Sequence, residues 1–388
     1  MKINYQMKLD KIINDIKNEE YVPTLLLHSC CGPCSSYVLE YLSEYFSITV
    51  FYYNPNIYPS NEYWYRVEEQ QKIIDLTSAK NSINLITGKY DVERFYNMTK
   101  GMEDMSEGGH RCHLCYEMRL REAAKIAQKE NFDYFTTTLT ISPHKNSQVL
   151  NRIGEKVAKE FGVNHLPSDF KKNNGYKRSV EITREAGLYR QDYCGCEYSK
   201  REAEIRKIKS EKKKLREDMK ELSKTISLEY MMESDKAITD KILNSQEYKK
   251  AKNIFCYIGD YPEINTRLFI EKAIEDGKKI SVPLCIDNSN MKAYRINSLN
   301  DLKEGKFGIP EPDPEISKEV LKSEIDLIIV PCCTVDSSGN RLGFGKGYYD
   351  RFMDEYTGNK LLPIRKKQMV DKVPIEEHDH KIKLIITE

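Results

Sequence analysis

Seven of the eleven cysteines lie in three short groups, and this spacing predicts thiolate chemistry. Isolated thiols mostly pack as small buried hydrophobes, but neighbouring thiols usually meet around a metal or a redox centre. The other four, Cys256, Cys285, Cys332 and Cys333, lie in apolar, strand-like runs and are expected to be ordinary core residues. The three groups are Cys30, Cys31 and Cys34, then Cys112 and Cys115, and finally Cys194 and Cys196.

The first two groups predict a metal centre. Cys30 and Cys31 follow a predicted strand and precede a predicted helix, whose free N–H groups favour negative charge. If Cys112 and Cys115 lie close to Cys30 and Cys31 in the fold, the four thiolates together suit either tetrahedral zinc or a 4Fe-4S cluster. The spacing does not choose between the two metals, and the competing interpretation is a set of buried free thiols.

The Cys194-Gly-Cys196 pair indicates a different chemistry. A single intervening glycine lets the two sulfur atoms approach as a strained, reducible pair. Two further metal ligands or two inert thiols are the alternatives.

A glycine-rich loop at residues 339–351 predicts a phosphate site in the second half, shortly after the apolar strand Asp326–Val330. Its glycines allow close backbone approach, and its basic side chains supply charge to phosphate oxygens. The spacing fits neither a Walker loop nor a Rossmann fingerprint, and a tight structural turn is the alternative. Asp350 could reach a magnesium ion on those phosphates. The residues concerned are Arg341, Gly343, Gly345, Lys346 and Gly347.

Two folded domains are needed to position these sites. The chain has 388 residues, of which 39% are hydrophobic, and a net charge of +1. No apolar stretch approaches the ~20 residues of a membrane span, and the N-terminus has no signal-peptide core, so we expect a cytoplasmic protein without membrane contact. We expect domains at 1–198 and 212–388, joined by a charged helical linker at 199–211.

Alternating apolar runs and amphipathic stretches predict an α/β fold for both domains. In the first, strands are expected at 24–28, 48–53, 83–86 and 132–139, and helices at 35–46, 64–76, 116–129 and 147–161. In the second, strands are expected at 254–258, 280–284, 292–296 and 327–330, and helices at 228–244, 265–277 and 347–356. Parallel sheets bind ligands at the carboxyl ends of their strands, which is where the first cysteine group lies.

Five motifs cover almost the whole of residues 24–198: His28-Ser-Cys-Cys-Gly-Pro-Cys34, Tyr53-Asn-Pro-Asn56, Arg111-Cys-His-Leu-Cys-Tyr-Glu-Met-Arg-Leu120, Thr137-Thr-Leu-Thr-Ile-Ser-Pro-His-Lys145 and Tyr189-Arg-Gln-Asp-Tyr-Cys-Gly-Cys196. In this order they resemble the cobalamin-independent epoxyqueuosine reductases of the QueH type. The resemblance implies a parallel-sheet, nucleotide-hydrolase-like (HUP-like) α/β domain. It also implies reduction of epoxyqueuosine to queuosine at the wobble position of a queuosine-family tRNA anticodon.

The same resemblance implies the roles of the cysteines. A 4Fe-4S cluster would be held by Cys30, Cys31, Cys112 and Cys115, and a redox-active disulfide would join Cys194 and Cys196. Two roles stay open for Cys34, a place near a second iron and simple packing. The electron donor is unidentified, and no residue is assigned as the proton donor.

A tRNA substrate should leave basic and aromatic side chains near the site. The candidates lie around a loop-like stretch that contains Asn173-Asn-Gly175, and a solvated polar surface is the alternative. The basic candidates are Lys171, Lys172, Lys177, Arg178 and Arg184, and the aromatic ones are Tyr176, Tyr189 and Tyr193.

A second set of motifs covers residues 209–388: Lys212-Lys-Lys-Leu-Arg216, Glu263-Ile-Asn-Thr266, Gly308-Ile-Pro-Glu-Pro312, the glycine loop, Pro374-Ile-Glu-Glu-His-Asp379 and Leu384-Ile-Ile-Thr387. These motifs resemble 5-formyltetrahydrofolate cyclo-ligase, an α/β enzyme that forms 5,10-methenyltetrahydrofolate with ATP and Mg²⁺. The resemblance implies that Asp350 and Asp379 bind Mg²⁺ and that Glu263 and the loop bind 5-formyltetrahydrofolate. The residues implied for ATP are Lys212, Arg216, Arg341, Leu342, Gly343, Phe344, Gly345, Lys346, Gly347, Tyr348 and Tyr349.

The second half departs from that family at two places. Leu361-Leu-Pro-Ile-Arg-Lys-Lys-Gln368 puts three basic residues where the family has an apolar strand, which is costly unless the strand lies at an edge. Pro331-Cys-Cys-Thr-Val-Asp336 puts cysteines where small or apolar residues are common.

From the two resemblances together we expect a bifunctional enzyme. The alternative is a zinc-thiolate tRNA-binding module fused to an ATPase or to an inactive cyclo-ligase-like domain.

Overall fold

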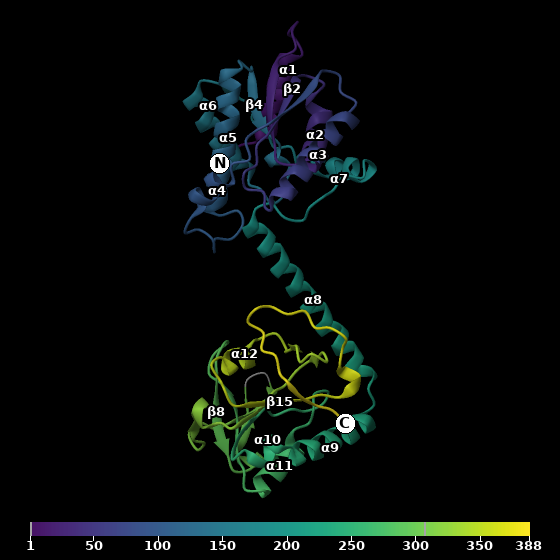
Figure 1. Ribbon diagram of the computed structural model, residues 1–388, viewed down its shortest axis with the longest axis vertical. Coiled ribbons are helices and arrows are strands. Elements are labelled where there is room, and N and C mark those ends of the chain that lie inside the picture. Colours follow the sequence, from purple (N-terminus) through teal and green to yellow (C-terminus); the bar gives the residue numbers. More distant parts are fainter. Residues whose placement is uncertain (1, 306–307) are drawn as a thin grey trace. The chain divides into compact units, whose positions relative to one another are not determined.

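The computed structural model describes residues 2–305 and 308–388 and divides the chain into two compact units, Met1–Glu204 and Ile205–Glu388. The division falls inside α8 (Glu197–Thr225), so the charged segment between the two sets of motifs is one continuous helix (Figure 1). Both units are mixed α/β structures, as the alternation of strands and helices predicts. Within the described residues, no helix is long and apolar enough to cross a membrane.

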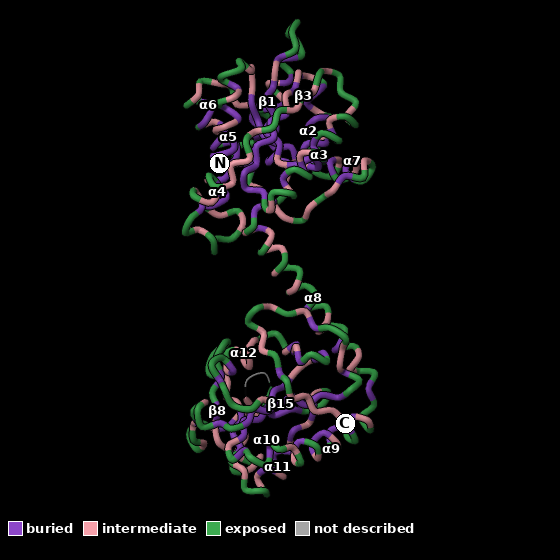
Figure 2. Tube along the Cα trace, viewed as in Figure 1, coloured by how far each residue is buried: buried purple, intermediate pink, exposed green. Residues whose placement is uncertain are grey.

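The first unit is built on a five-stranded parallel sheet with the strand order β3-β2-β1-β4-β5. The central strand β1 is buried along nearly its whole length, which explains its run of leucines (Figure 2). Because all the strands run the same way, their carboxyl ends meet at one edge. The strands are β1 (Thr24–Ser29), β2 (Ser47–Tyr52), β3 (Ile83–Thr87), β4 (Tyr134–Thr137) and β5 (Asn164–His165).

The helices of the first unit differ from prediction at two places that matter for the site. Helix α5 begins at His110, six residues before the predicted start, and therefore carries Cys112 and Cys115 in its first two turns. The stretch predicted to be loop-like is helical from Gly175 onward, because Ser179 and Thr183 are buried and Arg178 pairs with Glu181 one turn away. The helices are α1 (Tyr5–Ile16), α2 (Gly32–Leu42), α3 (Ser60–Leu76), α4 (Val92–Thr99), α5 (His110–Lys129), α6 (Ser147–Phe161) and α7 (Gly175–Glu185), with a 3₁₀ turn η1 (Thr138–Ile141).

The second unit is built on a seven-stranded mixed sheet with the strand order β11-β8-β7-β6-β12-β15-β16. Neighbouring strands are parallel in the series β7, β6, β12, β15 and β16. At the other edge, β8 pairs antiparallel with β7, and β11 pairs antiparallel with β8. The strands are β6 (Asn253–Cys256), β7 (Lys279–Cys285), β8 (Met291–Ile296), β11 (Glu319–Val320), β12 (Leu327–Ile329), β15 (Asn359–Pro363) and β16 (Leu384–Ile386).

Short elements complete the second unit and carry its glycine loop. The loop runs from β14 (Arg341–Leu342) into α12 (Tyr348–Met353), and Gly345 and Gly347 have positive φ angles of 100° and 68°, which favour glycine. The helices are α9 (Leu228–Asn244), α10 (Gln246–Lys250), α11 (Arg267–Glu275) and α12 (Tyr348–Met353), and two small sheets pair β9 (Leu302–Glu304) with β10 (Pro310–Pro312) and β13 (Thr334–Val335) with β14 (Arg341–Leu342).

The basic run after β15 corrects a prediction. The strand ends at Pro363, so no strand has to accommodate the three basic side chains. Lys366 and Lys367 are exposed, whereas Arg365 is fully buried, with its Nη2 atom 2.7 Å from Asp235 Oδ1. The guanidinium also donates to the carbonyl oxygens of Pro262 and Glu263. The buried charge of Arg365 is thus neutralised by Asp235. Its hydrogen bonds also connect the loop around Pro262 and Glu263 to the end of strand β15.

We predict that Arg365→Met destabilises the second unit by about 3–5 kcal/mol, because Asp235 would be left as an unpaired buried charge. Urea unfolding followed by a probe of this unit measures the change. Lys366→Met is the matched control, since its side chain is exposed, and should change stability by less than about 0.5 kcal/mol. Equal effects from the two substitutions would contradict the proposed role of Arg365.

Candidate active sites

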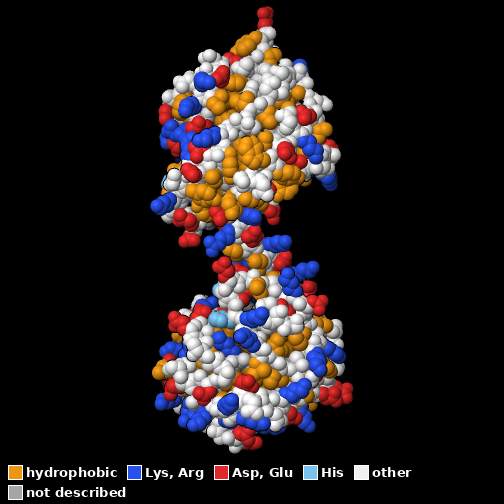
Figure 3. Space-filling model, viewed as in Figure 1, with side chains coloured by type: hydrophobic (Ala, Val, Ile, Leu, Met, Phe, Trp, Pro, Cys, Tyr) orange, Lys and Arg blue, Asp and Glu red, His pale blue; other side chains and the backbone are white. Residues whose placement is uncertain are grey.

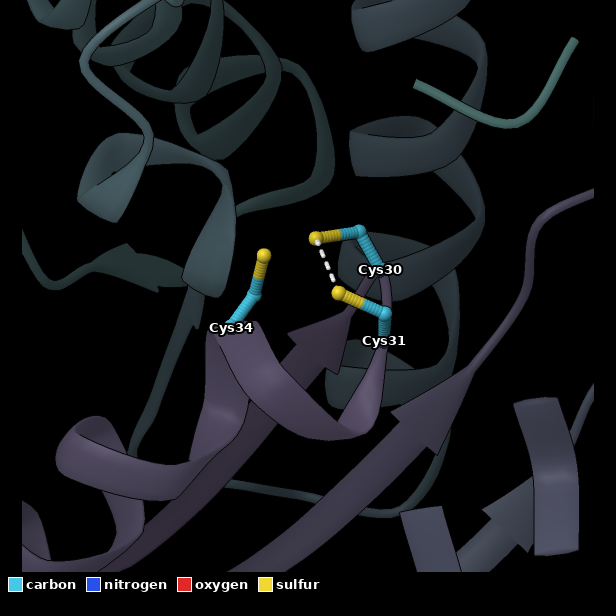
Figure 4. A group of neighbouring side chains, drawn as sticks. All are labelled: Cys30, Cys31 and Cys34. Carbon is cyan, nitrogen blue, oxygen red and sulfur yellow. Dashed lines mark hydrogen bonds between the residues drawn. The ribbon is translucent and has the colours of Figure 1, made fainter. Parts of the chain in front are cut away.

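Cys30, Cys31 and Cys34 form a compact thiol group at the carboxyl end of β1. Their sulfur atoms all lie within 4.8 Å of one another, and the Sγ atoms of Cys30 and Cys31 are 4.0 Å apart. Cys30 and Cys31 come from the turn after β1 and Cys34 from the first turn of α2, and the three side chains point toward one another (Figure 4). The structure therefore groups Cys34, whose role the sequence left open, with the first two predicted ligands.

Cys112, Cys115, Cys194 and Cys196 lie in the same unit but outside this compact group. Within the described residues, no other set of three potential metal ligands lies as close together as the Cys30 group. Cys112, Cys115 and Cys196 are buried, and all the cysteines are free thiols. The predicted convergence of Cys112 and Cys115 with Cys30 and Cys31 on one centre thus stays a prediction.

Two cations, the buried Arg119 and the half-buried Lys145, interact electrostatically with both sets of thiols. Burial opposes the charged form of Arg119, but Cys115, Cys194 and Cys30 outweigh it and raise the pKa of the guanidinium. The pKa of Lys145 is raised in the same way, against burial, by Cys194 and Cys30. Arg119 is held in place by Asn54, whose Oδ1 accepts its Nη1 hydrogen bond at 2.9 Å.

Within the Cys30 group, one sulfur is favoured as the thiolate. Hydrogen bonds from Cys31 and Cys34 hold the pKa of Cys30 well below its usual value, and the pKa of Cys34 is raised by the same contact. His28 does not compete for this charge. Burial lowers its pKa to about 3, and the neutral ring bridges Thr137 Oγ1 at 2.8 Å and the carbonyl oxygen of Tyr53 at 3.1 Å.

The surroundings of the thiols fit a group with negatively charged sulfur ligands. Several buried donors nearby have no hydrogen-bond partner within the described residues: Tyr52 Oη, Arg66 Nη1 and Nη2, and Arg119 Nη2. Unpaired buried donors are costly unless a ligand or another anion satisfies them. The donor set and the seven cysteines are thus compatible with an iron–sulfur or zinc group.

The basic residues predicted to contact tRNA divide into two classes. Lys171 pairs with Asp169 at 2.8 Å, and Arg178 pairs with Glu40 at 2.8 Å, so both are engaged within the protein. Lys172, Lys177 and Arg184 are exposed. Basic and acidic side chains are interspersed on the face shown in Figure 3, in keeping with the net charge of +1.

In the second unit, the predicted ATP, folate and magnesium residues all line one cavity of about 700 Å³. Arg216 from α8 donates from Nε to the carbonyl oxygen of Gly343 at 2.8 Å and so holds the glycine loop. Sequence reasoning missed further lining residues, although several of them lie inside quoted motifs: Ile309, Glu311, Pro331, Arg351, Glu376 and His378. The missed residues outside the motifs include Lys209, Tyr257 and Cys285.

The two predicted magnesium ligands are each engaged by a basic side chain. Asp350 Oδ1 accepts a hydrogen bond from Arg341 Nη2, and Asp379 Oδ2 lies 2.5 Å from Lys212 Nζ. The second carboxylate oxygen of each aspartate has no hydrogen bond within the described residues. One oxygen of each therefore remains for a hard cation, which fits Mg²⁺.

Three cysteines predicted to be core residues are only partly buried. Cys285 lines the large cavity, and Cys332 and Cys333 line a neighbouring cavity of about 370 Å³. Only Cys256 is the buried core residue that its apolar run predicts. The error arose because β7 and β12 end at the site, where a residue of an apolar run meets the cavity.

Glu263 lies at the wall shared by the two cavities. Burial raises its pKa to about 7, and its carboxylate has no hydrogen-bond partner within the described residues. A half-buried acceptor without a partner is suited to a donor group of a ligand. This supports the predicted substrate-binding role.

The fold and the two sites define two domains. The first is a parallel-sheet domain with a group of thiols at the carboxyl end of β1, and the second is an α/β domain with a glycine-rich loop of the kind that binds phosphate. Residues 25–202 match the family model described as epoxyqueuosine reductase QueH. Residues 208–388 match the model of the 5-formyltetrahydrofolate cyclo-ligase family. The chain belongs to the QueH family of epoxyqueuosine reductases and carries a cyclo-ligase-family domain after it.

Two curated QueH relatives agree with the family match of the first unit. The QueH of Streptococcus pyogenes serotype M1 is 44% identical over 200 residues, which are 51% of this chain and 78% of that protein. The QueH of Staphylococcus aureus is 44% identical over 202 residues, which are 51% of this chain and 84% of that protein. A solved Aquifex aeolicus 5,10-methenyltetrahydrofolate synthetase is 27% identical with a TM-score of 0.42, over 45% of this chain and 88% of that one.

We predict that Glu263→Gln stabilises the second unit increasingly as the pH rises. The native pKa of about 7 lies above the ordinary value of 4.5, so the folded state binds the proton more tightly and loses stability from pH ~4.5 upward to pH ~7. The gain of the Gln variant should reach at most about 3 kcal/mol above pH ~7, less wherever water reaches the site. Melting temperatures of both proteins across this range test the prediction, and a constant difference would contradict it.

Proposed function

We propose that the chain is a bifunctional enzyme. The first unit reduces epoxyqueuosine to queuosine in the anticodon of tRNA, and the second converts 5-formyltetrahydrofolate to 5,10-methenyltetrahydrofolate with ATP. The thiol group at the carboxyl edge of the first sheet supports the reductase assignment, together with the family match. The joint cavity around the glycine loop supports the cyclo-ligase assignment.

In the first unit, Cys30, Cys31, Cys112 and Cys115 would hold a 4Fe-4S cluster, and Cys34 would lie near a second iron or pack against the group. When bound, such a centre supplies electron transfer and a Lewis acid for the epoxide oxygen. Arg119 and Lys145 compensate the negative charge of the sulfur atoms and keep the site assembled.

The dithiol Cys194 and Cys196 accounts for the electron balance. Conversion of an epoxide to an alkene and water consumes two electrons and two protons. Oxidation of two thiols to one disulfide releases the same number of each, as the sulfur–sulfur bond forms. An external electron donor then returns the disulfide to the dithiol.

In the second unit, the bond between the β- and γ-phosphates of ATP breaks, ADP leaves, and the γ-phosphoryl group passes to the formyl oxygen of the folate, which makes that oxygen a leaving group. The neighbouring folate nitrogen attacks the formyl carbon, and release of phosphate closes the ring. The positive charges of Lys346 and Arg216 stabilise the negative charge on the transferred phosphoryl group. Glu263 accepts a hydrogen bond from the folate. Bound Mg²⁺, held by Asp350 and Asp379, would neutralise phosphate charge.

The competing function of the first unit is a zinc-thiolate tRNA-binding module without reduction. Anaerobic purification followed by metal and sulfide analysis separates the two. A brown protein with comparable iron and acid-labile sulfide supports the reductase, and a colourless protein with zinc alone would refute it.

Cysteine substitutions should separate the metal ligands from the redox pair. We predict that Cys112→Ser loses most of the bound iron, because a four-thiolate site loses one ligand. Cys194→Ser should retain iron but lose turnover, because no disulfide can form. Iron content and single-turnover reduction are measured on each anaerobic variant, and equal iron loss in both would refute this division of the cysteines.

Arg216 tests the second unit independently. Arg216→Met should lower kcat/KM for ATP-dependent methenyltetrahydrofolate formation by about 10²-fold, because both the loop contact and a charge on the transferred phosphate are lost. Lys213→Met, on the same helix but with a side chain that is 79% exposed, is the matched control and should leave the rate unchanged. A wild-type protein that makes no product at saturating ATP and Mg²⁺ would refute the cyclo-ligase assignment itself.

A further inference from the structure

We propose that an aromatic face of the first unit, formed by Tyr58, Trp64 and Tyr65, stacks an unpaired base of the anticodon loop next to the base that reacts. The proposal rests on the reductase function above and assigns a binding role to residues outside the thiol centre. It concerns how RNA is held at the site and involves no step of the reaction.

The three side chains present aromatic surface to solvent within eight residues of sequence. Their exposed fractions are 40% for Tyr58, 53% for Trp64 and 42% for Tyr65. Three exposed large rings in one short stretch of the chain are unusual unless they bind a partner. Rings of this kind are what proteins use to stack unpaired bases.

Trp64 is held rigidly from beneath. The fully buried ring of Tyr63 lies edge-on to it, with ring centroids 5.0 Å apart. Tyr63 is itself fixed by its hydroxyl group, which donates to the carbonyl oxygen of Gly88 at 3.2 Å, and by Tyr90, whose ring centroid lies 4.4 Å away. A ring fixed before binding loses little conformational entropy when a base stacks on it.

Two members of the aromatic face, Tyr58 and Tyr65, contact the segment that ends in the Cys194-Gly195-Cys196 turn. The backbone N–H of Tyr58 donates to the carbonyl oxygen of Gly195 at 2.9 Å. Tyr65 lies 5.2 Å from the ring of Tyr189, a few residues before the same turn. A substrate base that reaches the cysteines would therefore bring its neighbours in the loop onto these rings.

The charges around the face are mixed, because Glu68 of α3 is exposed near the rings, so a nucleic acid would be held there mainly by stacking. The two acidic side chains on the inner side of α3 are engaged, Glu62 by Arg66 at 2.7 Å and Glu69 by the backbone N–H of Tyr189 at 2.6 Å. Arg66 is buried with both Nη atoms unpartnered within the described residues, and its guanidinium lies 5.2 Å from the ring of Tyr193. Because few free cations surround the face, we expect a shallow salt dependence of binding.

The chain offers a direct probe, because Trp64 is its only tryptophan. A synthetic anticodon stem-loop RNA of a queuosine-family tRNA is titrated into the anaerobically purified full-length protein. We expect saturable quenching of the tryptophan emission and a Kd that changes little with salt. Trp64→Ala should weaken binding about tenfold, measured with a labelled RNA, while Trp64→Phe keeps most of the affinity.

Tyr21→Ala is the matched control. Tyr21 is 57% exposed but precedes β1, so it lies at the amino edge of the sheet, opposite the cysteines. This variant should bind the stem-loop like the wild type, and a blunt RNA duplex should not quench Trp64.

Three outcomes would overturn the proposal: no quenching by the stem-loop, an affinity of Trp64→Ala within twofold of the wild type, or equal quenching by the duplex. Failure of the reductase function is seen separately, as a wild-type protein that binds the stem-loop but does not convert epoxyqueuosine. A wild type that reduces its substrate while Trp64→Ala shows unchanged KM and kcat would refute the aromatic face alone. An increase in KM with kcat retained is the expected result.

Discussion

Burial of sulfur charge is the constraint on which the first unit depends. A thiolate away from water is stable only beside cations and hydrogen-bond donors, and this unit buries both around its cysteines. Arg119 and Lys145 face both the Cys30 group and Cys194, and neither forms an ion pair with a carboxylate within the described residues. Their charges are therefore available to sulfur, and they explain how thiols from separate elements can share one region.

The second unit handles buried charge in another way. Two ion pairs, Arg341 with Asp350 and Lys212 with Asp379, line the cavity. The charges of these four side chains are therefore already paired in the protein without a ligand. Arg365 and Asp235 do the same beneath the Glu263 segment. Paired charges hold the loop and the walls in place, and the unpaired Glu263 carboxylate remains as the acceptor.

Much of the architecture followed from the sequence, because strand and helix periodicity is a local property. The predicted strand at residues 24–28 and helix at 147–161 agree with β1 and α6, and the glycine loop lies where its motif placed it. The predictions failed where distant partners decide the outcome. Residues 175–185 are helical because they pack on helix α2, and Arg365 is buried because Asp235, 130 positions earlier, pairs with it.

The sequence by itself determined which residue types are present, their spacing, and the order of strands and helices that brings parallel strand ends to one edge. Those features were enough to indicate thiolate chemistry in one half and a phosphate loop in the other. Only the tertiary structure decided that Cys34 lies with Cys30 and Cys31, and that the exposed ring of Trp64 rests on the buried ring of Tyr63. The reason is physical: spacing fixes neighbours within a turn of chain, whereas sulfur contacts and ring exposure depend on how separate elements pack.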